Sequence, residues 1–431
     1  MIWNPQAERL ERPARERLQL ERLRDTIRWA VERVAFHRAR IGGVTIGSLD
    51  DLPRLPFVRK SDLRDQYPFG LLAVDRRQVA RIHASSGTKG KPTVAPYTAE
   101  DLDVWREVMA RALTAAGARR GDLLHVAFGY GLFTGGLGFH DGAERLGMTV
   151  VPVSSGNSAR HHLLLQDFRP DVLAATPSFA LHLAETMAEQ GGKPRELGLR
   201  VGVFGAEPWT DAIRLALERA FDLTAFDVYG LSEIIGPGVA GECEARDGLH
   251  IADDHFLPEI IDPASGEALP PGREGELVFT TLTKRAMPLV RYRTGDITSL
   301  NLEPCRCGRT SARMARIKGR SDDMLIVKGV NLYPSEVEAT LLGVEELVPH
   351  YQLIVDRSST LARLEVQVEP SPAVVARCDG FDPAHPILVE LQRRVAARLS
   401  SAIGLSVALT LVAPRTVPRS EGKAVRVVEK A

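Results

Sequence analysis

The chain has 431 residues, of which 44% are hydrophobic and 26% charged, and its 55 basic side chains balance 55 acidic ones. This composition is typical of a globular protein of about two to three domains, and it excludes disordered, collagen-like and fibrous classes. Zero net charge gives no reason to expect binding to nucleic acid or to anionic membranes. Because no apolar stretch could span a bilayer and no signal-peptide pattern opens the chain, we expect a cytoplasmic protein.

The predicted elements begin with a helix over residues 20–34, where apolar side chains recur every three or four positions. Beyond residue 80, short apolar runs alternate with helix-length segments, and this order predicts a largely parallel α/β sheet. The predicted strands are 123–128, 149–151, 172–175 and 201–204, and the predicted helices include 101–116 and 178–190. Residues 257–300 are rich in turns and predict β-structure without a helix.

A smaller α+β unit is predicted towards the C-terminus. Alternating strands over 364–368 and 407–411 enclose a helix with an apolar stripe from Leu388 to Leu399. The polar stretch Gly319–Asp323 precedes this unit and marks a boundary. We therefore predict a large domain over residues 1–320 and a small domain over residues 321–431.

The segment Ser85–Pro92 (SSGTKGKP) combines glycines, hydroxyls and two lysines in a chain with only nine lysines. Glycines let backbone N–H groups close on a phosphate, while hydroxyl and ammonium groups add donors. Pro92 stands where a Walker A loop needs Ser or Thr, so this is not a P-loop of that kind. A flexible surface turn is the alternative reading.

Ser85–Pro92 resembles the signature loop of the adenylate-forming superfamily, which includes acyl-CoA synthetases, peptide-synthetase adenylation domains and luciferases. Further motifs of that superfamily follow in the expected order: Tyr229–Glu233, Tyr292–Asp296, Gly319–Asp323 and Glu421–Lys423. Within the superfamily, three segments look like the phenylacetate-CoA ligase family: Gly129–Gly138, Phe204–Trp209 and Tyr229–Ala240. The resemblance extends from about residue 50 to the C-terminus.

This resemblance implies a fold and a reaction. The fold is a large α/β domain with mostly parallel sheets and a β-rich part, followed by a small mobile α+β domain. An aryl acid and MgATP would give acyl-adenylate and pyrophosphate, and CoA would then displace AMP after the small domain turns about Asp322. Implied partners are the acid, ATP, Mg²⁺ and CoA; a homodimer and a place in aromatic acid catabolism are implied as well.

The same resemblance assigns roles to individual residues. Lys423 would bridge the substrate carboxylate and the α-phosphate, although a solvated tail lysine is the alternative. Glu233 would hold Mg²⁺, a hard cation that prefers carboxylate oxygens. Tyr229 would stack on adenine, unless it is simply a core aromatic. The ATP-binding residues are predicted to be Ser85, Ser86, Gly87, Thr88, Lys89, Gly90, Lys91, Gly205, Ala206, Glu207, Asp227, Tyr229, Gly230, Ser232, Asp296 and Arg320.

The glycine-rich stretch that starts at Gly129 suits a backbone lying against a planar ligand, with aromatic walls around it. A buried strand-to-helix turn is the alternative. The predicted acid-binding residues are Tyr130, Phe133, Gly135, Gly136, Phe139, His140 and Asp141. Phe139 and Asp141 depart from the family pattern, so Phe139 is expected to shrink the pocket and Asp141 to accept a hydrogen bond from a polar ring substituent. Lys328 and Gly329 would contact CoA.

Cys243, His250, Cys305 and Cys307 form a possible structural zinc set, because three thiols and one imidazole would complete a tetrahedral site. Free thiols are the alternative. Other functions also stay open: a substituted benzoate loaded onto a carrier-protein phosphopantetheine, a P-loop phosphotransferase, which Pro92 disfavours, and a non-enzymatic nucleotide-binding protein.

Overall fold

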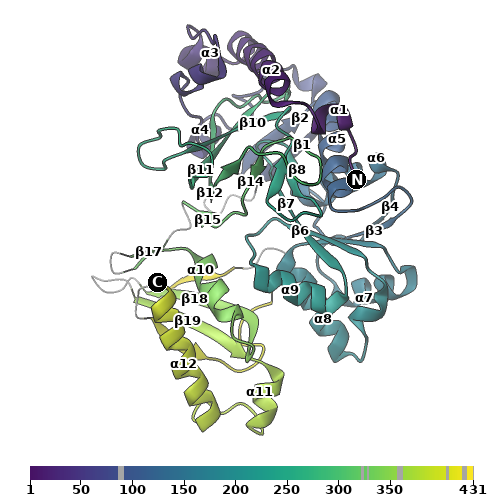
Figure 1. Cartoon of the computed structure of the whole chain (residues 1–431), viewed down its shortest axis with the longest axis vertical. Coiled ribbons are helices and arrows are strands. Elements are labelled where there is room, and N and C mark those ends of the chain that lie inside the picture. Colours follow the sequence, from purple (N-terminus) through teal and green to yellow (C-terminus); the bar gives the residue numbers. More distant parts are fainter. Residues whose placement is uncertain are drawn as a thin grey trace. The chain divides into compact units, whose positions relative to one another are not determined.

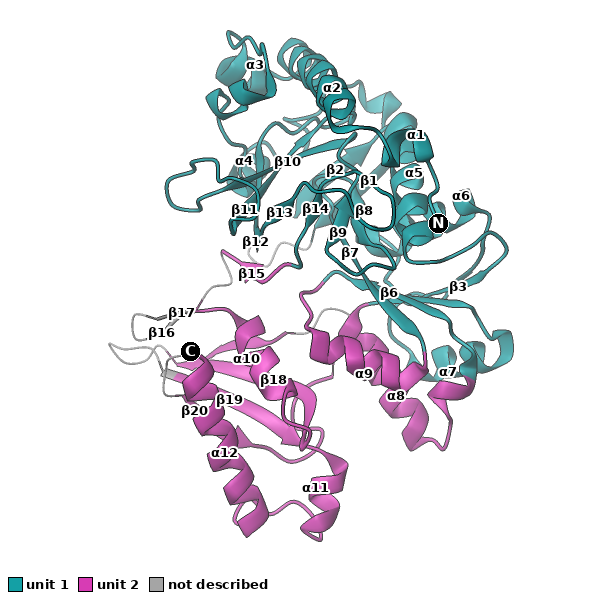
Figure 2. Ribbon diagram, viewed as in Figure 1, with its two compact units in different colours: residues 1–175, 197–206, 223–316 teal, residues 176–196, 207–222, 317–431 magenta. Residues whose placement is uncertain are grey.

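A computed structural model describes residues 1–85, 92–321, 325–327, 330–356, 363–403, 407–419 and 425–430. These residues form two compact units, coloured separately in Figure 2. The first unit comprises residues 1–175, 197–206 and 223–316; the second comprises residues 176–196, 207–222 and 317–431. The second unit therefore includes the helices α8 (Pro177–Glu189) and α9 (Asp211–Phe221) along with the C-terminal part. The domain boundary at residue 320 stays a prediction.

A nine-stranded sheet crosses the first unit in the order β13-β14-β9-β8-β7-β6-β5-β3-β4. Figure 1 labels six of its strands, from β14 to β4. The strands from β7 to β4 are parallel, as the alternation of apolar runs and helices predicted. From β7 to β13 the pairing is antiparallel, because short turns and not helices join several of these strands. The strands are β3 (Leu123–Val126), β4 (Thr149–Pro152), β5 (Val172–Ala175), β6 (Val201–Gly205), β7 (Thr224–Leu231), β8 (Gly236–Glu242), β9 (Leu249–Ile251), β13 (Leu300–Asn301) and β14 (Arg313–Met314).

Helices α5 (Ala99–Ala115) and α6 (Thr134–Leu146) pack against each other and against β8. Their buried side chains share one apolar cluster with β3, β5, β6 and β7. The close approach depends on Gly138, where an added Cβ would lie 2.6 Å from both Trp105 and Pro237. Three glycines of the segment Gly129–Gly138 lie inside α6, although a high glycine content does not favour a helix. Helix α7 (Ser158–Phe168) follows β4.

A second sheet of the first unit contains the consecutive antiparallel strands β10 (Phe256–Ile261), β11 (Gly275–Thr281) and β12 (Tyr292–Thr298). The N-terminal stripe is confirmed as α2 (Arg12–Arg33), whose Leu23 and Ile27 pack with Leu257 and Leu282. Strands β1 (Arg81–Ser85) and β2 (Thr93–Tyr97) form a separate antiparallel pair. Shorter helices are α1 (Pro5–Glu8), α3 (Ala35–Ile41) and α4 (Lys60–Asp65).

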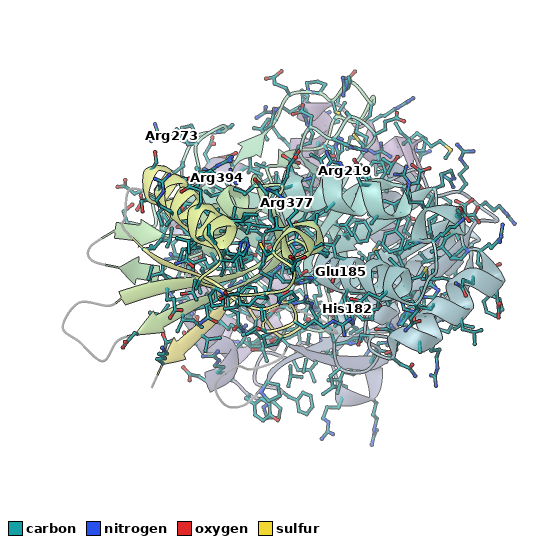
Figure 3. The ribbon with its side chains drawn as sticks, turned by 90° about the horizontal axis from the view of Figure 1, so that it is seen from below. His182, Glu185, Arg219, Arg273, Arg377 and Arg394 are labelled. Atoms are coloured by element: carbon teal, nitrogen blue, oxygen red, sulfur yellow. The ribbon has the colours of Figure 1, made fainter. Side chains whose placement is uncertain are left out.

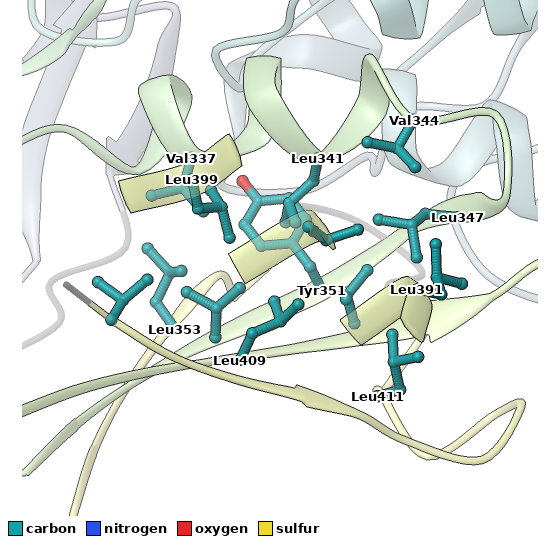
Figure 4. Packing of buried hydrophobic residues seen from close by; sticks show 14 of the residues in the cluster. Val337, Leu341, Val344, Leu347, Tyr351, Leu353, Leu391, Leu399, Leu409 and Leu411 are labelled. Carbon is teal, nitrogen blue, oxygen red and sulfur yellow. The ribbon is translucent and has the colours of Figure 1, made fainter. Parts of the chain in front are cut away.

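The C-terminal part of the second unit confirms the predicted α+β pattern. Its sheet runs β20-β19-β18-β21, and side chains of α10 and α12 fill its core with Tyr351 and Leu353 (Figure 4). Its elements are α10 (Pro334–Leu342), β18 (Leu347–Asp356), β19 (Arg363–Pro370), α11 (Pro372–Arg377), α12 (Pro386–Ile403), β20 (Ala408–Leu411) and β21 (Val427–Lys430), preceded by β15 (Gly319–Arg320), β16 (Leu325–Val327) and β17 (Val330–Leu332). Across the described residues, no helix has both the length and the apolar character that crossing a membrane requires.

Candidate active site and metal centre

Tyr229 and Asp296, which the sequence assigns to adenine and ribose, lie side by side in the first unit. Tyr229 is near the end of β7 and Asp296 is on β12. The Tyr229 hydroxyl donates a hydrogen bond to Asp296 Oδ2 at 2.6 Å. A carboxylate that accepts a hydrogen bond and is 8% exposed is fixed in orientation, which suits a group that must accept from a sugar hydroxyl.

The other predicted residues of this segment lie on β7 and in the turn that follows it. The Asp227 backbone N–H donates to Glu242 at 2.8 Å, and the Arg316 guanidinium lies 3.5 Å from the same carboxylate. Gly230 is required by a close approach, because a Cβ there would be 1.8 Å from the Gly236 carbonyl oxygen. Ser232 is buried beside Thr134, with 3.1 Å between their hydroxyls.

Glu233 occupies the turn between β7 and β8, and its side chain is only 5% exposed. Within the described part of the chain its nearest counter-charge is Lys60, whose Nζ lies 3.8 Å from Glu233 Oε1. Lys284 donates to the main-chain oxygen of Glu233 at 3.0 Å. The Glu233 carboxylate is thus buried with one cation 3.8 Å away and without a hydrogen-bond donor among the described residues. A buried charge of this kind requires compensation, and a bound metal ion would supply it.

Sequence reasoning missed Lys60 and Lys284, since neither lies in a recognised motif. The scarcity of lysine was a signal that could have found them. In a chain whose basic residues are mostly Arg, a Lys is expected where a compact ammonium is needed. Burial lowers the pKa of Lys284 to about 8, although the carboxylates of Asp101 and Glu233 oppose this shift.

Several predicted residues lie outside the described part of the chain: Ser86, Gly87, Thr88, Lys89, Gly90, Lys91, Asp322, Lys328, Gly329 and Lys423. Ser85 ends β1, and Gly205 ends β6, directly before Ala206 with its positive φ of 70°. Glu207 and Arg320 belong to the second unit, where Glu207 accepts a hydrogen bond from the Ser178 backbone at 2.7 Å. The ligand roles of all these residues stay predictions.

The predicted acid-binding residues fall into two groups. Tyr130 and Phe133 lie in the loop before α6, and Gly135 and Gly136 are in its first turn. The Tyr130 hydroxyl and His140 Nδ1 are 3.3 Å apart, and burial, with the nearby charges of Asp141 and Glu144, raises the pKa of Tyr130 well above its ordinary value. This tyrosine therefore stays neutral and can serve as an amphipathic pocket wall.

Asp141 and Phe139, which are predicted to set the acid specificity, both have partners within the first unit. The Asp141 carboxylate pairs with the Arg81 guanidinium of β1 at 2.7 Å. Phe139 is 1% exposed and stacks on Phe128, with ring centroids 4.9 Å apart. Asp141 thus already has a strong donor, and Phe139 belongs to the core shared by α6 and the sheet.

The three thiols and the imidazole of the predicted zinc set come together. Their ligand atoms all lie within 4.8 Å of one another. The Sγ atoms of Cys243 and Cys305 are 3.8 Å apart, and Cys307 Sγ is 3.4 Å from His250 Nε2. Tetrahedral zinc with Zn–S bonds of about 2.3 Å would separate two sulfurs by about 3.8 Å and a sulfur from a nitrogen by about 3.5 Å.

The surroundings of this cluster also suit a metal. His250 Nδ1 lies 3.2 Å from the Ser311 hydroxyl, which leaves Nε2 directed at the thiols. Burial lowers the pKa of His250, so the imidazole is neutral and able to ligate. The hydrogen bond between Cys243 and Cys307, with His250 and Arg309 nearby, lowers the pKa of Cys307 and raises that of Cys243, so this pair favours one thiolate and one thiol in the absence of a metal.

Comparisons with known proteins show which family the chain belongs to. The family model described as AMP-binding enzyme matches residues 37–282, and the model described as AMP-binding enzyme C-terminal domain matches residues 329–431. A phenylacetate-coenzyme A ligase of Thermus thermophilus is 52% identical over 99% of this chain and 98% of its own length. One of Escherichia coli K12 is 48% identical over 96% of this chain and 94% of its own length.

Solved structures give the same relationship. A 2-hydroxyisobutyryl-CoA ligase in the postadenylation state, in complex with its acyl-AMP, matches with a TM-score of 0.93 at 30% identity, covering 100% of this chain and 92% of that one. The same ligase in the thioesterification state, with CoA bound, matches with a TM-score of 0.73 over 99% and 92% of the two chains. From the extent and level of these matches, this chain belongs to the phenylacetate-CoA ligase family of the AMP-binding enzymes.

Proposed function

We propose that this protein is an ATP-dependent phenylacetate-CoA ligase. It activates phenylacetate as phenylacetyl-adenylate with release of pyrophosphate, and then transfers the acyl group to CoA with release of AMP. The observation that carries this proposal is the identity of 48–52%, over nearly the whole chain, to four relatives named phenylacetate-coenzyme A ligase. The pairing of Tyr229 with Asp296 beside the turn of Glu233 gives it a physical basis.

In the first half-reaction a carboxylate attacks the α-phosphorus of ATP, so two anions must be held together. Lys423 neutralises both, and the loop Ser85–Lys91 encloses the phosphates. Glu233 would hold Mg²⁺, which would supply charge neutralisation on the triphosphate, and Lys60 lies close enough to that carboxylate to add a second cation. Tyr229 orders Asp296, which accepts from the ribose hydroxyls.

In the second half-reaction the small domain, residues 321–431, turns about Asp322. This rotation withdraws Lys423 and brings Lys328 and Gly329 to the CoA thiol, which attacks the acyl carbon and releases AMP. Gly329 leaves room for the pantetheine arm because it has no side chain. Each half-reaction would thus use a different face of one domain.

The acid-binding side of the site favours an unsubstituted ring. The Asp141 carboxylate is neutralised by Arg81, so it offers a polar substituent no unpaired charge. Tyr130, Phe133, Gly135 and Gly136 then supply apolar contacts to a flat ring. This arrangement supports phenylacetate over hydroxy- or amino-substituted acids.

The test is acid-dependent pyrophosphate release with MgATP over a panel of phenylacetate, benzoate and their hydroxy and amino derivatives, with and without CoA. We expect preference for phenylacetate and thioester formation only with CoA. Preference for a substituted benzoate, or transfer to a carrier-protein phosphopantetheine in place of CoA, would replace this proposal. No pyrophosphate with any acid would overturn it.

Two variants test whether Lys423 and Gly329 act in different half-reactions. Lys423→Ala should abolish pyrophosphate release from ATP, yet still convert supplied phenylacetyl-adenylate into thioester. Gly329→Leu should spare adenylate formation and block transfer to CoA. Equal loss of both half-reactions in either variant would contradict the two-state use of the small domain.

We propose further that Cys243, His250, Cys305 and Cys307 bind one structural zinc ion. Four protein ligands leave no open position for chemistry, so the ion would only fix the loops around β9 and β14. Metal analysis should find about one zinc per chain, and Cys305→Ser should lose it and lower the melting temperature. Cys378→Ser, which changes a buried thiol of the C-terminal core, is the matched control. Protein that neither contains nor takes up zinc would refute this site.

A homodimer in the cytoplasm is part of the same proposal, on the strength of the family resemblance alone. Light scattering on the purified protein tests the oligomeric state directly. A monomeric mass at micromolar concentration would remove the dimer from the proposal without affecting the proposed reaction.

A further inference from the structure

Lys284 is a buried cation that no sequence motif accounts for. It lies in the loop between β11 and β12, and the residue is 2% exposed. Its ammonium donates to the main-chain oxygen of Glu233 at 3.0 Å and lies 4.5 Å from the centroid of the Tyr97 ring. Taking an ammonium out of water is costly unless hydrogen bonds and a π-face or counter-charge compensate. Here the hydrogen bond goes to the turn that carries Glu233, and the π-face belongs to Tyr97 at the end of β2.

Tyr97 completes the contacts to that turn. Its hydroxyl donates to the carbonyl oxygen of Ser232 at 2.9 Å and lies 3.3 Å from that of Ile235. The ring is fully buried and stacks on Trp105, with centroids 5.2 Å apart. Lys284 and Tyr97 together therefore hold three carbonyl groups of the turn 232–235, which joins β7 to β8 and carries Glu233.

The loop that carries Lys284 is itself anchored. The Asp101 carboxylate accepts hydrogen bonds from the backbone N–H groups of Arg285 at 2.6 Å and Ala286 at 2.9 Å. Asp101 is fully buried in the first turn of α5, where it also accepts from the Thr98 backbone. The ammonium of Lys284 therefore projects from a main chain that has little freedom to move.

We infer that Lys284 is a positioning residue for Glu233. Its ammonium, with the Tyr97 hydroxyl, fixes the main chain of the turn 232–235 and so sets where the Glu233 carboxylate meets the magnesium-bound triphosphate. This inference rests on the proposed function, in which Glu233 holds Mg²⁺. Lysine suits the position because a compact ammonium can reach one carbonyl under an aromatic ring, whereas the guanidinium fork of arginine is larger and planar.

Calorimetric titration with ATP, in the presence and in the absence of Mg²⁺, tests this role. Lys284→Met keeps the length of the side chain but removes the donors and the charge. We expect it to weaken ATP binding about tenfold with Mg²⁺ and less than twofold without it, as loss of a hydrogen bond from a charged donor implies. Tyr97→Phe should weaken ATP binding in the presence of Mg²⁺ about threefold. The magnesium concentration for half-maximal pyrophosphate release should rise in parallel.

Lys193→Met is the matched control, because Lys193 is exposed and, among the described residues, forms an ion pair with Glu196 three residues away. Unchanged ATP binding by Lys284→Met in the presence of Mg²⁺ would overturn the inference, and so would an equal loss with and without the ion. If Lys284→Met does not fold, the milder Tyr97→Phe decides by the same criterion. Because binding of ATP is measured, failure of phenylacetate as the substrate would be seen separately and would affect only the proposed reaction.

Discussion

The Tyr229 hydroxyl donates a hydrogen bond of 2.6 Å to the Asp296 carboxylate, and this contact joins β7 to β12 across 67 positions of sequence. The two residues come from different sequence motifs, each assigned to a different part of the nucleotide. Their contact means that the group expected beside adenine also orients the group expected to bind ribose. The two roles are therefore coupled.

Tyr229→Phe separates these roles, because it keeps the aromatic face and removes the hydroxyl. We expect the KM for ATP to rise about tenfold, as loss of a hydrogen bond to a charged acceptor implies about 1.5 kcal/mol. The KM for the acid should change less than twofold. Steady-state kinetics with each substrate varied in turn measures both values, and an unchanged KM for ATP would show that Asp296 needs no such orientation.

Phe139 stacks on Phe128 in the core and is expected to act on stability. Phe139→Ala should lower the free energy of unfolding by about 3–5 kcal/mol, since it removes a buried ring and leaves a cavity. Denaturant titration measures this loss. Phe133→Ala is the comparison, because Phe133 is 37% exposed at the start of α6 and should affect the KM for the acid more than stability. A change of acid preference in a stable Phe139→Ala protein would instead place Phe139 in the pocket.

Glu185 of α8 offers a test of the proposed domain rotation within the second unit, and Figure 3 labels its side chain. Both of its carboxylate oxygens accept from His350 Nε2, at 2.8 and 2.9 Å. Arg419 lies 3.9 Å away and is held by two hydrogen bonds of 2.8 Å to Glu369. Arg419 precedes Lys423 by four residues, so this contact joins α8 to the segment that leads to the proposed catalytic lysine.

Glu185→Ala should therefore slow pyrophosphate release by about fivefold, the effect of about 1 kcal/mol for a pair in which the Glu185 side chain is 34% exposed and that of His350 is 9% exposed. Thioester formation from supplied phenylacetyl-adenylate should stay the same or rise, because the proposed rotation no longer has to break this contact. Glu390→Ala, which removes an exposed carboxylate of α12 that pairs with Arg393, is the control. Equal slowing of both half-reactions would assign Glu185 a purely structural role.

Two buried histidines predict how stability depends on pH. His125 Nε2 and His161 Nδ1 are 2.8 Å apart, and burial, with the neighbouring imidazole, lowers the pKa of His125 to about 3; burial lowers that of His161 to about 4. Unfolding returns the pKa of both histidines to about 6.5, so the unfolded state binds more protons than the folded state below that pH. Stability is therefore complete above pH 6.5 and falls as the pH drops.

The expected loss is about 1 kcal/mol per histidine between pH 6.5 and 5.5. Denaturant titrations at these two pH values measure it in the wild-type chain. His125→Met, which keeps an apolar side chain in the core, should remove about 1 kcal/mol of the difference. Other buried histidines, such as His37 and His255, whose pKa burial lowers to about 4, contribute to the rest. An identical difference in the variant would contradict neutral burial of His125.

The order of elements along the chain was readable from the sequence because it depends on local periodicity. The stripe of α2, the apolar runs of β3 to β6 and the alternation in β19 all repeat over neighbouring residues. The motifs around Tyr229 and Asp296 were likewise recognisable, since each lies within a few consecutive positions. The three cysteines and one histidine that could bind zinc were also recognisable, although the sequence alone left free thiols equally open.

Only the tertiary structure decided which of these groups meet. Lys60 and Lys284 contact Glu233 although each is more than 50 positions away from it in the sequence. No local sequence pattern predicts such contacts. Arg81 of β1 pairs with Asp141 of α6, a contact between distant segments that the sequence did not predict. The structure places Phe139 of α6 in the core, whereas its expected effect on the acid pocket stays a prediction. The sequence by itself determined the chemical groups and the local elements, while packing between distant segments decided which charges are paired and which side chains are buried.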